Sequence, residues 1–149
     1  MHLTMQGIGF TDEVERADVD RIVDAVHKHC AELAPFTVTI GPAHVDPETI
    51  QMPVRPVEPL AAVRDTIRAA IGDVWSIERV PEAANGYRPH VSLGYSNSAS
   101  PAEPIADALA RHGERTAEVN VSAVSLIDLN RDRKAYEWIE IVKVPLGRP

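Results

Sequence analysis

The sequence of 149 residues has a single cysteine, no long apolar run and a deficit of basic residues. Because Cys30 has no second cysteine to pair with, we expect no internal disulfide and a reducing compartment, by default the cytoplasm. The apolar runs are far too short to cross a bilayer, so no membrane association is predicted. The N-terminus shows no basic region followed by an apolar stretch, and no signal peptide is expected.

The shortage of basic residues limits the kind of partner. The chain carries 15 Lys and Arg against 22 Asp and Glu, a net charge of −7. Proteins that bind long nucleic acids gain most of their affinity by neutralising phosphates, which requires a basic surface. A long duplex is therefore not expected as a partner. A nucleotide substrate is expected to be short, or to be bound only at its end in a local basic pocket.

What is present is the composition of an ordinary globular protein, with 44% hydrophobic and 25% charged residues, enough for one domain with a sizeable core. Apolar spacing predicts helices over residues 18–33, 60–71 and 104–112, with Gly72 and Gly113 ending the last two. Strands are predicted over residues 2–8, 36–40, 49–54, 90–95, 118–129 and 135–146. The last two strands are expected to form a hairpin around a charged turn at residues 130–134.

A short tripeptide pattern occurs twice, as His2-Leu3-Thr4 and as His90-Val91-Ser92. Each copy has a histidine, an apolar residue and a hydroxyl residue within a predicted strand. Residues i and i+2 of a strand point to the same face, so each copy can direct an imidazole and a hydroxyl to one place. Only one residue precedes the first copy in this sequence, and little chain is there to hold it in place.

The order of elements around the two copies also repeats. A strand with the tripeptide, a helix and a strand pair occur in residues 2–54 and again in residues 90–146. Such a repeat predicts a single α+β domain with two pseudo-symmetric lobes, about residues 1–72 and 86–149. Each lobe is expected to contain a small, mainly antiparallel sheet with outer helices, and the active groove is expected to lie between the lobes.

Two such pairs facing a common groove suit the hydrolysis of a 2′,3′-cyclic phosphate. One neutral and one protonated imidazole can remove a proton from water and give one to the departing ribose oxygen near neutral pH. The hydroxyls of Thr4 and Ser92 can hydrogen-bond the non-bridging oxygens and stabilise charge in the transition state. This chemistry requires no metal and no other cofactor, and none is expected.

The flanks of both copies, His2-Leu3-Thr4-Met5-Gln6-Gly7 and Arg88-Pro89-His90-Val91-Ser92-Leu93-Gly94, resemble the 2H phosphoesterases. This family includes the 2′-5′ RNA ligases and cyclic nucleotide phosphodiesterases, and its signature is two His-x-Thr/Ser motifs, one in each lobe. The resemblance extends over nearly the whole chain. It implies a metal-independent enzyme acting on a 2′,3′-cyclic phosphate or a 2′-5′ linkage. His2 and His90 would share the acid and base roles, and Thr4 and Ser92 would bind the phosphate.

One departure from the family concerns the first motif. Family members usually carry a strand and a helix before it, and this sequence has neither. The sheet next to His2 is therefore expected to have an unpaired edge, which a second copy of the chain could fill as a homodimer. The departure also motivates an alternative function, a non-catalytic nucleotide or phosphate binder of the same fold. A third hypothesis is an acidic interaction domain without a phosphate site.

Residues around the second motif are further candidates. Arg88 can bind a phosphate as a forked donor, and a solvated loop arginine is an equally good interpretation. Tyr87 and Tyr95 flank the motif and are candidates for stacking on a nucleobase. For Tyr136 and Trp138 we expect packing in the core, with base stacking as the lesser alternative.

Other polar clusters have simpler interpretations. His27, His29 and Cys30 do not have metal-binding spacing on a helix, so solvated histidines and a core cysteine are predicted. The basic turn residues Arg131, Arg133 and Lys134 are expected to be solvated, with contact to the substrate as the lesser alternative. The sequence leaves open the natural substrate, the direction of the reaction and which histidine is the base.

Overall fold

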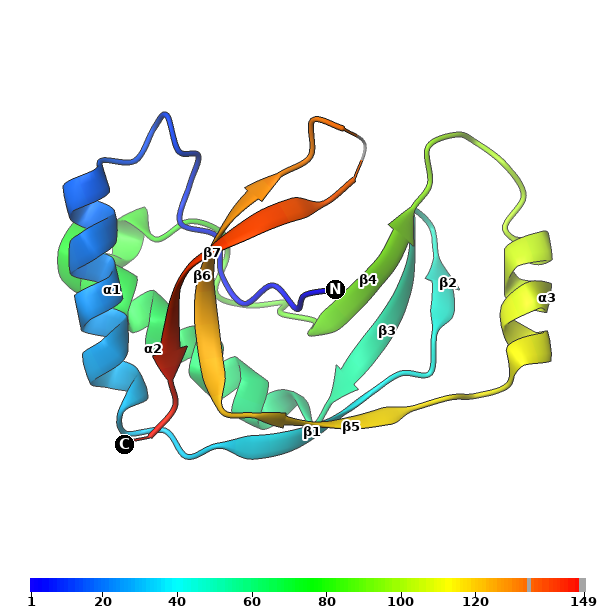
Figure 1. The fold of residues 1–149 in the computed structure, drawn as a ribbon, viewed down its shortest axis with the longest axis horizontal. Coiled ribbons are helices and arrows are strands. Elements are labelled where there is room, and N and C mark those ends of the chain that lie inside the picture. The colour runs from blue at the N-terminus through cyan, green and yellow to red at the C-terminus, as the bar shows by residue number, and fades with distance from the viewer. Residues whose placement is uncertain (134, 148–149) are drawn as a thin grey trace.

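Two antiparallel sheets of unequal size organise the part of the chain that this computed structural model describes, residues 1–133 and 135–147 (Figure 1). The helices are α1 (Arg16–Cys30), α2 (Val57–Trp75) and α3 (Glu103–His112), with a 3₁₀ turn at Ile77–Arg79. The strands are β1 (Phe36–Ile40), β2 (His44–Asp46), β3 (Thr49–Arg55), β4 (His90–Tyr95), β5 (Ala117–Val121), β6 (Ala123–Asn130) and β7 (Glu137–Pro145). The predicted α+β class is confirmed.

The larger sheet brings together strands from both halves of the chain. Its order is β2-β3-β1-β5, and β4 pairs with β3 along the opposite side from β1 and β2. All of these pairings are antiparallel. The second motif lies in β4, where His90 is opposite Pro53 and Val91 is opposite Met52. The division into lobes at residues 72 and 86 stays a prediction.

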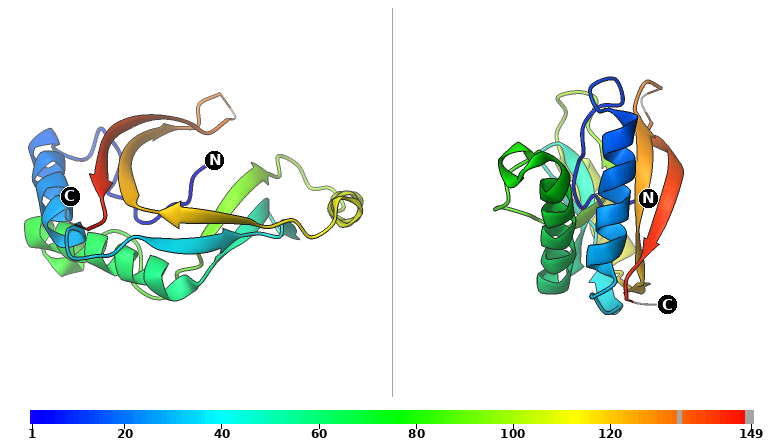
Figure 2. Two further views of the ribbon diagram at one scale, coloured as in Figure 1. Left: turned by 60° about the horizontal axis from the view of Figure 1, so that its bottom comes forward. Right: turned by 90° about the vertical axis from the view of Figure 1, so that its left-hand side faces the viewer.

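The smaller sheet is the β6–β7 hairpin, which confirms the predicted strand pair. The single strand expected over residues 118–129 is wrong, because the chain is interrupted at Ser122. Before this residue β5 pairs with β1 of the larger sheet, and after it β6 pairs with β7. The hairpin then curves over the N-terminal segment, as Figure 2 shows. One continuous apolar pattern thus serves two sheets.

Helices α1 and α2 pack against each other at one end of the molecule, and α3 lies at the other end (Figure 1). Their apolar faces and the C-terminal part of β7 enclose a core that contains Ile22, Cys30, Ile71 and Val144. Cys30 is fully buried there, as predicted. None of the helices in the described ranges is long and apolar enough to span a bilayer.

The predicted end of α2 at Gly72 is wrong, because the helix continues to Trp75. The indole N–H of Trp75 donates to a carboxylate oxygen of Asp18 on α1 at 2.6 Å, which fixes the last turn. Ser76 then takes a left-handed φ of 74° and donates its backbone N–H to the Gly72 carbonyl. A side chain at position 72 would lie 3.3 Å from the Ile77 side chain, so packing explains this glycine.

The strand predicted over residues 2–8 is also wrong. Leu3 makes one isolated antiparallel bridge to Val91, and residues 4–8 belong to no strand. Side chains satisfy this backbone instead: the Met5 carbonyl accepts from Arg64, and the Gly7 N–H donates to the Glu82 carboxylate. The N-terminal segment therefore lies along the outer edge of β4 without extending the sheet.

Candidate active site

The bridge between Leu3 and Val91 joins the central residues of the two tripeptides. Both side chains point into an apolar cluster beneath the larger sheet. In a strand the neighbouring residues project to the opposite face, so His2, Thr4, His90 and Ser92 share the other face. Antiparallel pairing places the residue before one partner opposite the residue after the other. His2 therefore lies across from Ser92, and Thr4 across from His90, in a pseudo-two-fold arrangement.

The His90 ring is oriented by its own chain. Its Nδ1 lies 2.8 Å from the Arg88 carbonyl oxygen, and because a carbonyl only accepts, Nδ1 carries the hydrogen. The other ring nitrogen, Nε2, is then the one that exchanges protons with a bound molecule. The side chain is exposed, and the buried Val91 anchors the backbone beside it. A fixed ring with one free nitrogen is suited to acid or base catalysis.

His2 lies against the hairpin. Its ring centroid is 5.2 Å from that of Trp138, in an edge-on arrangement, and 5.9 Å from that of Tyr136. Partial burial, and then the positive N-terminal ammonium group, lower the pKa of His2 below its ordinary value. The neutral imidazole is therefore favoured at this position, which is the form that accepts a proton.

Tyr95 and Tyr136 connect the two motif copies. Their rings are stacked with centroids 5.0 Å apart, and the Tyr95 hydroxyl donates to Ser92 Oγ at 3.1 Å. Arg131 donates to the Tyr136 hydroxyl at 3.2 Å and lies over its ring. Interactions with Tyr95 and Arg131 lower the pKa of Tyr136, whereas burial raises that of Tyr95. The expected core packing of Tyr136 and Trp138 is wrong, because Trp138 is 39% exposed and both rings face His2.

A hollow of about 360 Å³ opens beside the motifs. Residues from both copies line it, namely Thr4 and His90, together with Arg88 and the buried Arg64. The wall of this hollow has two arginines and one histidine beside a single carboxylate, that of Glu82. His2 and Ser92 are not among its lining residues. Tyr87 contributes one side of the hollow, where its ring packs against the Arg64 guanidinium at 5.0 Å. Burial raises the pKa of Tyr87 to about 12.

Two buried arginines of α2 were missed by the sequence analysis. Arg64 is 4% exposed and makes three hydrogen bonds of 2.9–3.0 Å to the carbonyl oxygens of Met5, Ala83 and Ala84. It therefore connects the residue that follows the first motif to the loop that leads to the second. The available signal was its position: Arg64 lies four residues after the buried Leu60, on the inward face of an amphipathic helix.

Arg68 lies one turn further along the same face and is 7% exposed. Its Nη1 atom is within hydrogen-bond distance of Gln6 Oε1 at 2.8 Å, the Pro81 carbonyl at 2.9 Å and the Glu82 carbonyl at 3.1 Å. The Gln6 amide also donates to the Pro81 carbonyl at 2.7 Å. We call this set of contacts, made by Arg64 and Arg68 with residues 5–7 and 81–84, the arginine clamp.

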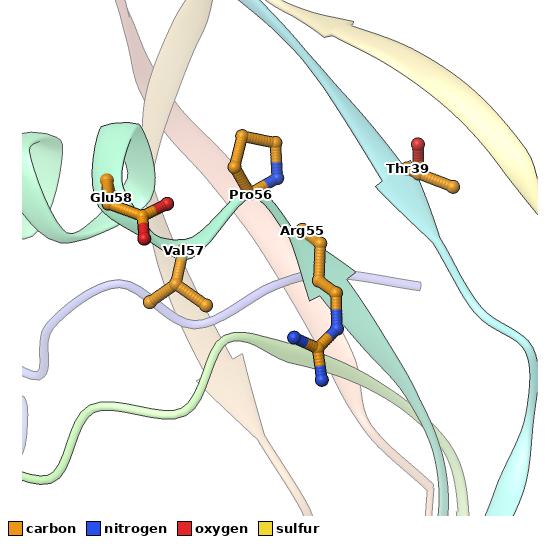
Figure 3. A pocket seen from close by; sticks show the side chains of 5 residues that line it. All are labelled: Thr39, Arg55, Pro56, Val57 and Glu58. Carbon is orange, nitrogen blue, oxygen red and sulfur yellow. The ribbon is translucent and has the colours of Figure 1, made fainter.

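A second hollow, of about 430 Å³, lies where β3 ends and α2 begins (Figure 3). Thr39, Arg55, Pro56, Val57 and Glu58 line it, and no residue of either motif does. It combines one cation and one carboxylate and has no histidine in its lining. The smaller hollow is therefore the better candidate for the active site.

Within the described ranges no group of three or more His, Cys, Asp or Glu side chains is arranged to hold a metal ion. His29 is paired with Asp73 at 2.8 Å, between α1 and α2. The basic turn residues Arg131 and Arg133 are exposed, and Lys134 lies outside the described residues. Arg131 contacts Tyr136 of the site, so its predicted role as a merely solvated turn residue is too simple.

Comparisons with known proteins agree on the fold. The family model described as the 2′-5′ RNA ligase superfamily matches residues 1–133. No curated protein sequence matches the chain significantly. Among solved structures, TT0787 of Thermus thermophilus superposes with a TM-score of 0.72 at 18% identity, covering 99% of this chain and 79% of that one.

Two further structures are similar at lower identity. A protein described as a phosphoesterase gives a TM-score of 0.65 at 14% identity, over 99% of this chain and 77% of that one. LigT of E. coli, in its apo form, gives 0.64 at 12% identity, over 99% and 76% of the two chains. At these identities the structures show a shared fold, and the chemistry has to be argued from the site.

Proposed function

Because the chain belongs to the 2′-5′ RNA ligase superfamily, we propose that it is a metal-independent phosphoesterase that acts on a 2′,3′-cyclic phosphate or a 2′-5′ phosphodiester. Its family and fold are those of the 2H phosphoesterases. The observation that carries the proposal is the bridge between Leu3 and Val91, which puts both His-x-hydroxyl copies on one face. The proposed substrate is a nucleotide or a short RNA end.

In the proposed hydrolysis, a water oxygen attacks the phosphorus of the cyclic phosphate. One neutral imidazole takes the proton of this water as the new P–O bond forms. The bond between phosphorus and the ribose 3′ oxygen breaks, and the protonated imidazole gives its proton to that oxygen. The product is a 2′-phosphate with a free 3′ hydroxyl. Each proton transfer is expected to contribute on the order of 10²–10⁴-fold to the rate.

The hydroxyl groups of Ser92 and Thr4 have different surroundings for binding the phosphate. The Tyr95 hydroxyl donates to Ser92 Oγ, so the hydrogen of Ser92 is available for a non-bridging phosphate oxygen. A donor that is itself hydrogen-bonded is polarised and becomes a better donor. Thr4 is exposed on the same face, beside His90. We propose that both hydroxyls stabilise the charge of the transition state, and that Arg88 binds the phosphate from the loop.

Aromatic rings extend the site on the His2 side. Tyr136 and the exposed Trp138 lie against His2, and Tyr95 is stacked on Tyr136. We propose that these rings receive the nucleobase. Base stacking on such rings contributes about 1–3 kcal/mol and tolerates any base. Tyr87 is a further candidate for stacking, with the Arg64 guanidinium over one face of its ring. A short substrate suits the net charge of −7, since few phosphates then meet the acidic surface.

The test is an assay with a short oligonucleotide that ends in a 2′,3′-cyclic phosphate, in the presence of EDTA. We expect release of a 2′-phosphate end by the native protein and its loss in His90→Ala. An Arg111→Lys variant on the exposed side of α3 is a matched control and is expected to be fully active. The reverse reaction is followed with a 2′,3′-cyclic phosphate end and a 5′ hydroxyl end. Attack of this hydroxyl on phosphorus breaks the bond to the ribose 3′ oxygen, which takes the proton, and forms a 2′-5′ linkage.

Two outcomes would contradict the proposal. If native protein and His90→Ala are equally inactive with every cyclic-phosphate and 2′-5′ substrate, the chain is not an enzyme of this kind. Binding of the oligonucleotide without turnover, weakened by Ser92→Ala, would then identify the alternative, a non-catalytic phosphate binder. If EDTA abolishes an otherwise normal activity, the mechanism without a metal is wrong.

A further inference from the structure

The N-terminal segment needs an anchor that the backbone does not supply. Among residues 2–4, Leu3 alone makes a bridge to β4, and residues 4–8 pair with no strand. A segment with one isolated bridge is held only weakly by main-chain pairing. Two imidazoles that exchange protons with one phosphate nevertheless need a fixed separation. The structure must therefore hold this segment by side-chain contacts.

The arginine clamp makes these contacts and joins the flanks of both motifs. Arg64 and Arg68 are four residues apart, so they project from the same face of α2. On one side they bind the Met5 carbonyl and the Gln6 side chain, directly after the first motif. On the other side they bind carbonyls of residues 81–84, in the loop that leads into His90. One helix thus contacts both the chain directly after the first motif and the loop that precedes the second.

Glu82 completes the clamp at its outer side. Its carboxylate accepts the Gly7 N–H at 3.2 Å and lies 3.5 Å from Arg64. The backbone of Glu82 has a left-handed φ of 61°, which costs a residue with a side chain about 1 kcal/mol or more. The loop keeps this unfavourable shape while its carbonyls converge on the two guanidinium groups. The local strain supports a geometric role for this loop.

The energetics of buried charge favour the same interpretation. A buried guanidinium is costly unless its N–H groups are satisfied, and apolar replacements of such networks are often equally stable. Stability alone therefore explains two buried arginines poorly. A guanidinium has five donors in a fixed planar fork, so it can bind several carbonyls at set angles. This property matches the observed contacts to two separate segments.

We propose that Arg64 and Arg68 are positioning residues, which set the separation of the His2 and His90 rings by holding residues 5–7 and 81–84 on α2. The proposal rests on the proposed function, because its value to the protein is a correct geometry for proton transfer. Neither arginine is proposed to react. Arg64 also borders the hollow, but its Nε, Nη1 and Nη2 atoms each donate to a carbonyl, of Met5, Ala84 and Ala83 respectively.

The test uses Arg64→Lys and Arg68→Lys, each made separately. Lysine keeps the charge and most of the length but loses the planar fork. A shift of about 1 Å at the reacting groups costs on the order of 10²-fold in rate, so we expect kcat to fall by roughly that factor while KM changes little. The His2 ring signals in NMR spectra should move, with a pKa closer to the ordinary value because the ring loses its partial burial. Signals of α1 and α3 should not move.

Arg111→Lys, the same exchange on exposed α3, is the matched control and should leave kcat and the His2 signals unchanged. If Arg64→Lys or Arg68→Lys folds poorly, Gln6→Leu tests the same contact from the other side with a side chain of similar size. It removes the partner of Arg68 and should move the His2 signals in the same direction, with a smaller loss of kcat.

The outcomes separate this inference from the proposed function. If the native protein is active, folded lysine variants with native kcat and unmoved His2 signals overturn the inference and leave the function intact. If the native protein has no activity on any substrate, the proposed function fails. The positioning role of Arg64 and Arg68 is then tested by the NMR signals of the His2 ring alone. Displaced His2 signals in the lysine variants then still support the clamp, and unmoved signals overturn it.

Discussion

The two copies of the His-x-hydroxyl motif have the same chemistry but different structural support. His90-Val91-Ser92 lies in β4, which is paired with β3 from His90 to Tyr95. His2-Leu3-Thr4 makes one bridge to that strand and is otherwise held by side chains of α2 and the loop before β4. Main-chain pairing supports one half of the site, and two arginines support the other half.

This difference indicates which half of the site is disturbed more easily by a substitution. A strand ladder distributes its support over many hydrogen bonds, so no single side chain decides whether it forms. A clamp of two guanidinium groups concentrates the support in a few atoms. Substitutions far from the phosphate are therefore expected to disturb His2 and Thr4 more readily than His90 and Ser92.

The largest expected effect comes from removing the hydroxyl in each copy. Thr4→Val and Ser92→Ala should each lower kcat by on the order of 10²-fold, the usual cost of losing a donor to a transition-state oxyanion. Steady-state kinetics with the cyclic-phosphate oligonucleotide measure this. Tyr95→Phe is the discriminating variant, because it removes the hydrogen bond to Ser92 Oγ and leaves Thr4 untouched.

Equal losses in Thr4→Val and Ser92→Ala would show that both copies contact the phosphate. If Thr4→Val keeps native kcat while Ser92→Ala loses it, the two copies do not form one site. Tyr95→Phe should cost less than Ser92→Ala and should add nothing in a Tyr95→Phe/Ser92→Ala double variant.

The next effect compares the middle residues of the motifs. Val91 is buried, and Val91→Ala should lower the free energy of unfolding by about 2 kcal/mol through lost burial and a small cavity. Leu3 is half-buried, so Leu3→Ala should cost about 1 kcal/mol or less. Denaturant titration measures both values. Activity should fall more in Leu3→Ala, because detachment of the N-terminal segment removes His2 from the site.

Amide hydrogen exchange provides the control for this comparison. Residues 2–7 should exchange faster than residues 90–95 in the native protein, since their opening needs only the bridge and the clamp to break. Equal protection of the two segments would contradict the difference in support. A larger global destabilisation by Leu3→Ala than by Val91→Ala would contradict it as well.

The smallest expected effect is a dependence on pH that is specific to the first copy. Burial and the N-terminal ammonium group lower the pKa of His2 in the folded state. At mildly acidic pH the unfolded chain then binds more protons than the folded one, so the free energy of unfolding falls as the pH drops below the ordinary histidine pKa of about 6.5. His2→Asn should remove this part of the slope.

Stability curves between pH 5 and 8 check the effect. A His27→Asn variant on the exposed face of α1 is the matched control and should keep the slope that His2 produces. A slope of the opposite sign, with stability gained by protonation of His2, would show that this ring has an anionic partner in the folded state.

The sequence allowed the regular parts of the molecule to be predicted, because local patterns determine them. The alternation of apolar and polar residues, together with turn residues, predicted β1, β3, β4 and the β6–β7 hairpin. Gly113 predicted the end of α3. The continuous pattern of β-forming residues across Ser122 concealed a change of sheet, because β5 pairs with β1 and β6 pairs with β7. The N-terminal strand was predicted from apolar residues whose backbone is in fact bound by side chains from distant segments.

The sequence predicted which residues of the two motifs lie near one another, but it predicted their surroundings only in part. The repeated tripeptide identified the four residues that the structure brings to one face. Tyr136 and Trp138 were assigned to the core because aromatic residues in strands usually pack there, and the curvature of the hairpin turns them toward His2 instead. The partners of Arg64 lie 19, 20 and 59 residues away, so no local pattern reveals them.

The central claim is that the two tripeptides form one phosphate site. NMR spectra of the His2 and His90 rings during titration with 2′-AMP, which carries the 2′-phosphate of the proposed product, test it most directly. We predict that the signals of both rings shift and saturate with the same dissociation constant, and that Ser92→Ala weakens both responses together. A response of His90 alone, with His2 unmoved at saturation, would contradict the claim.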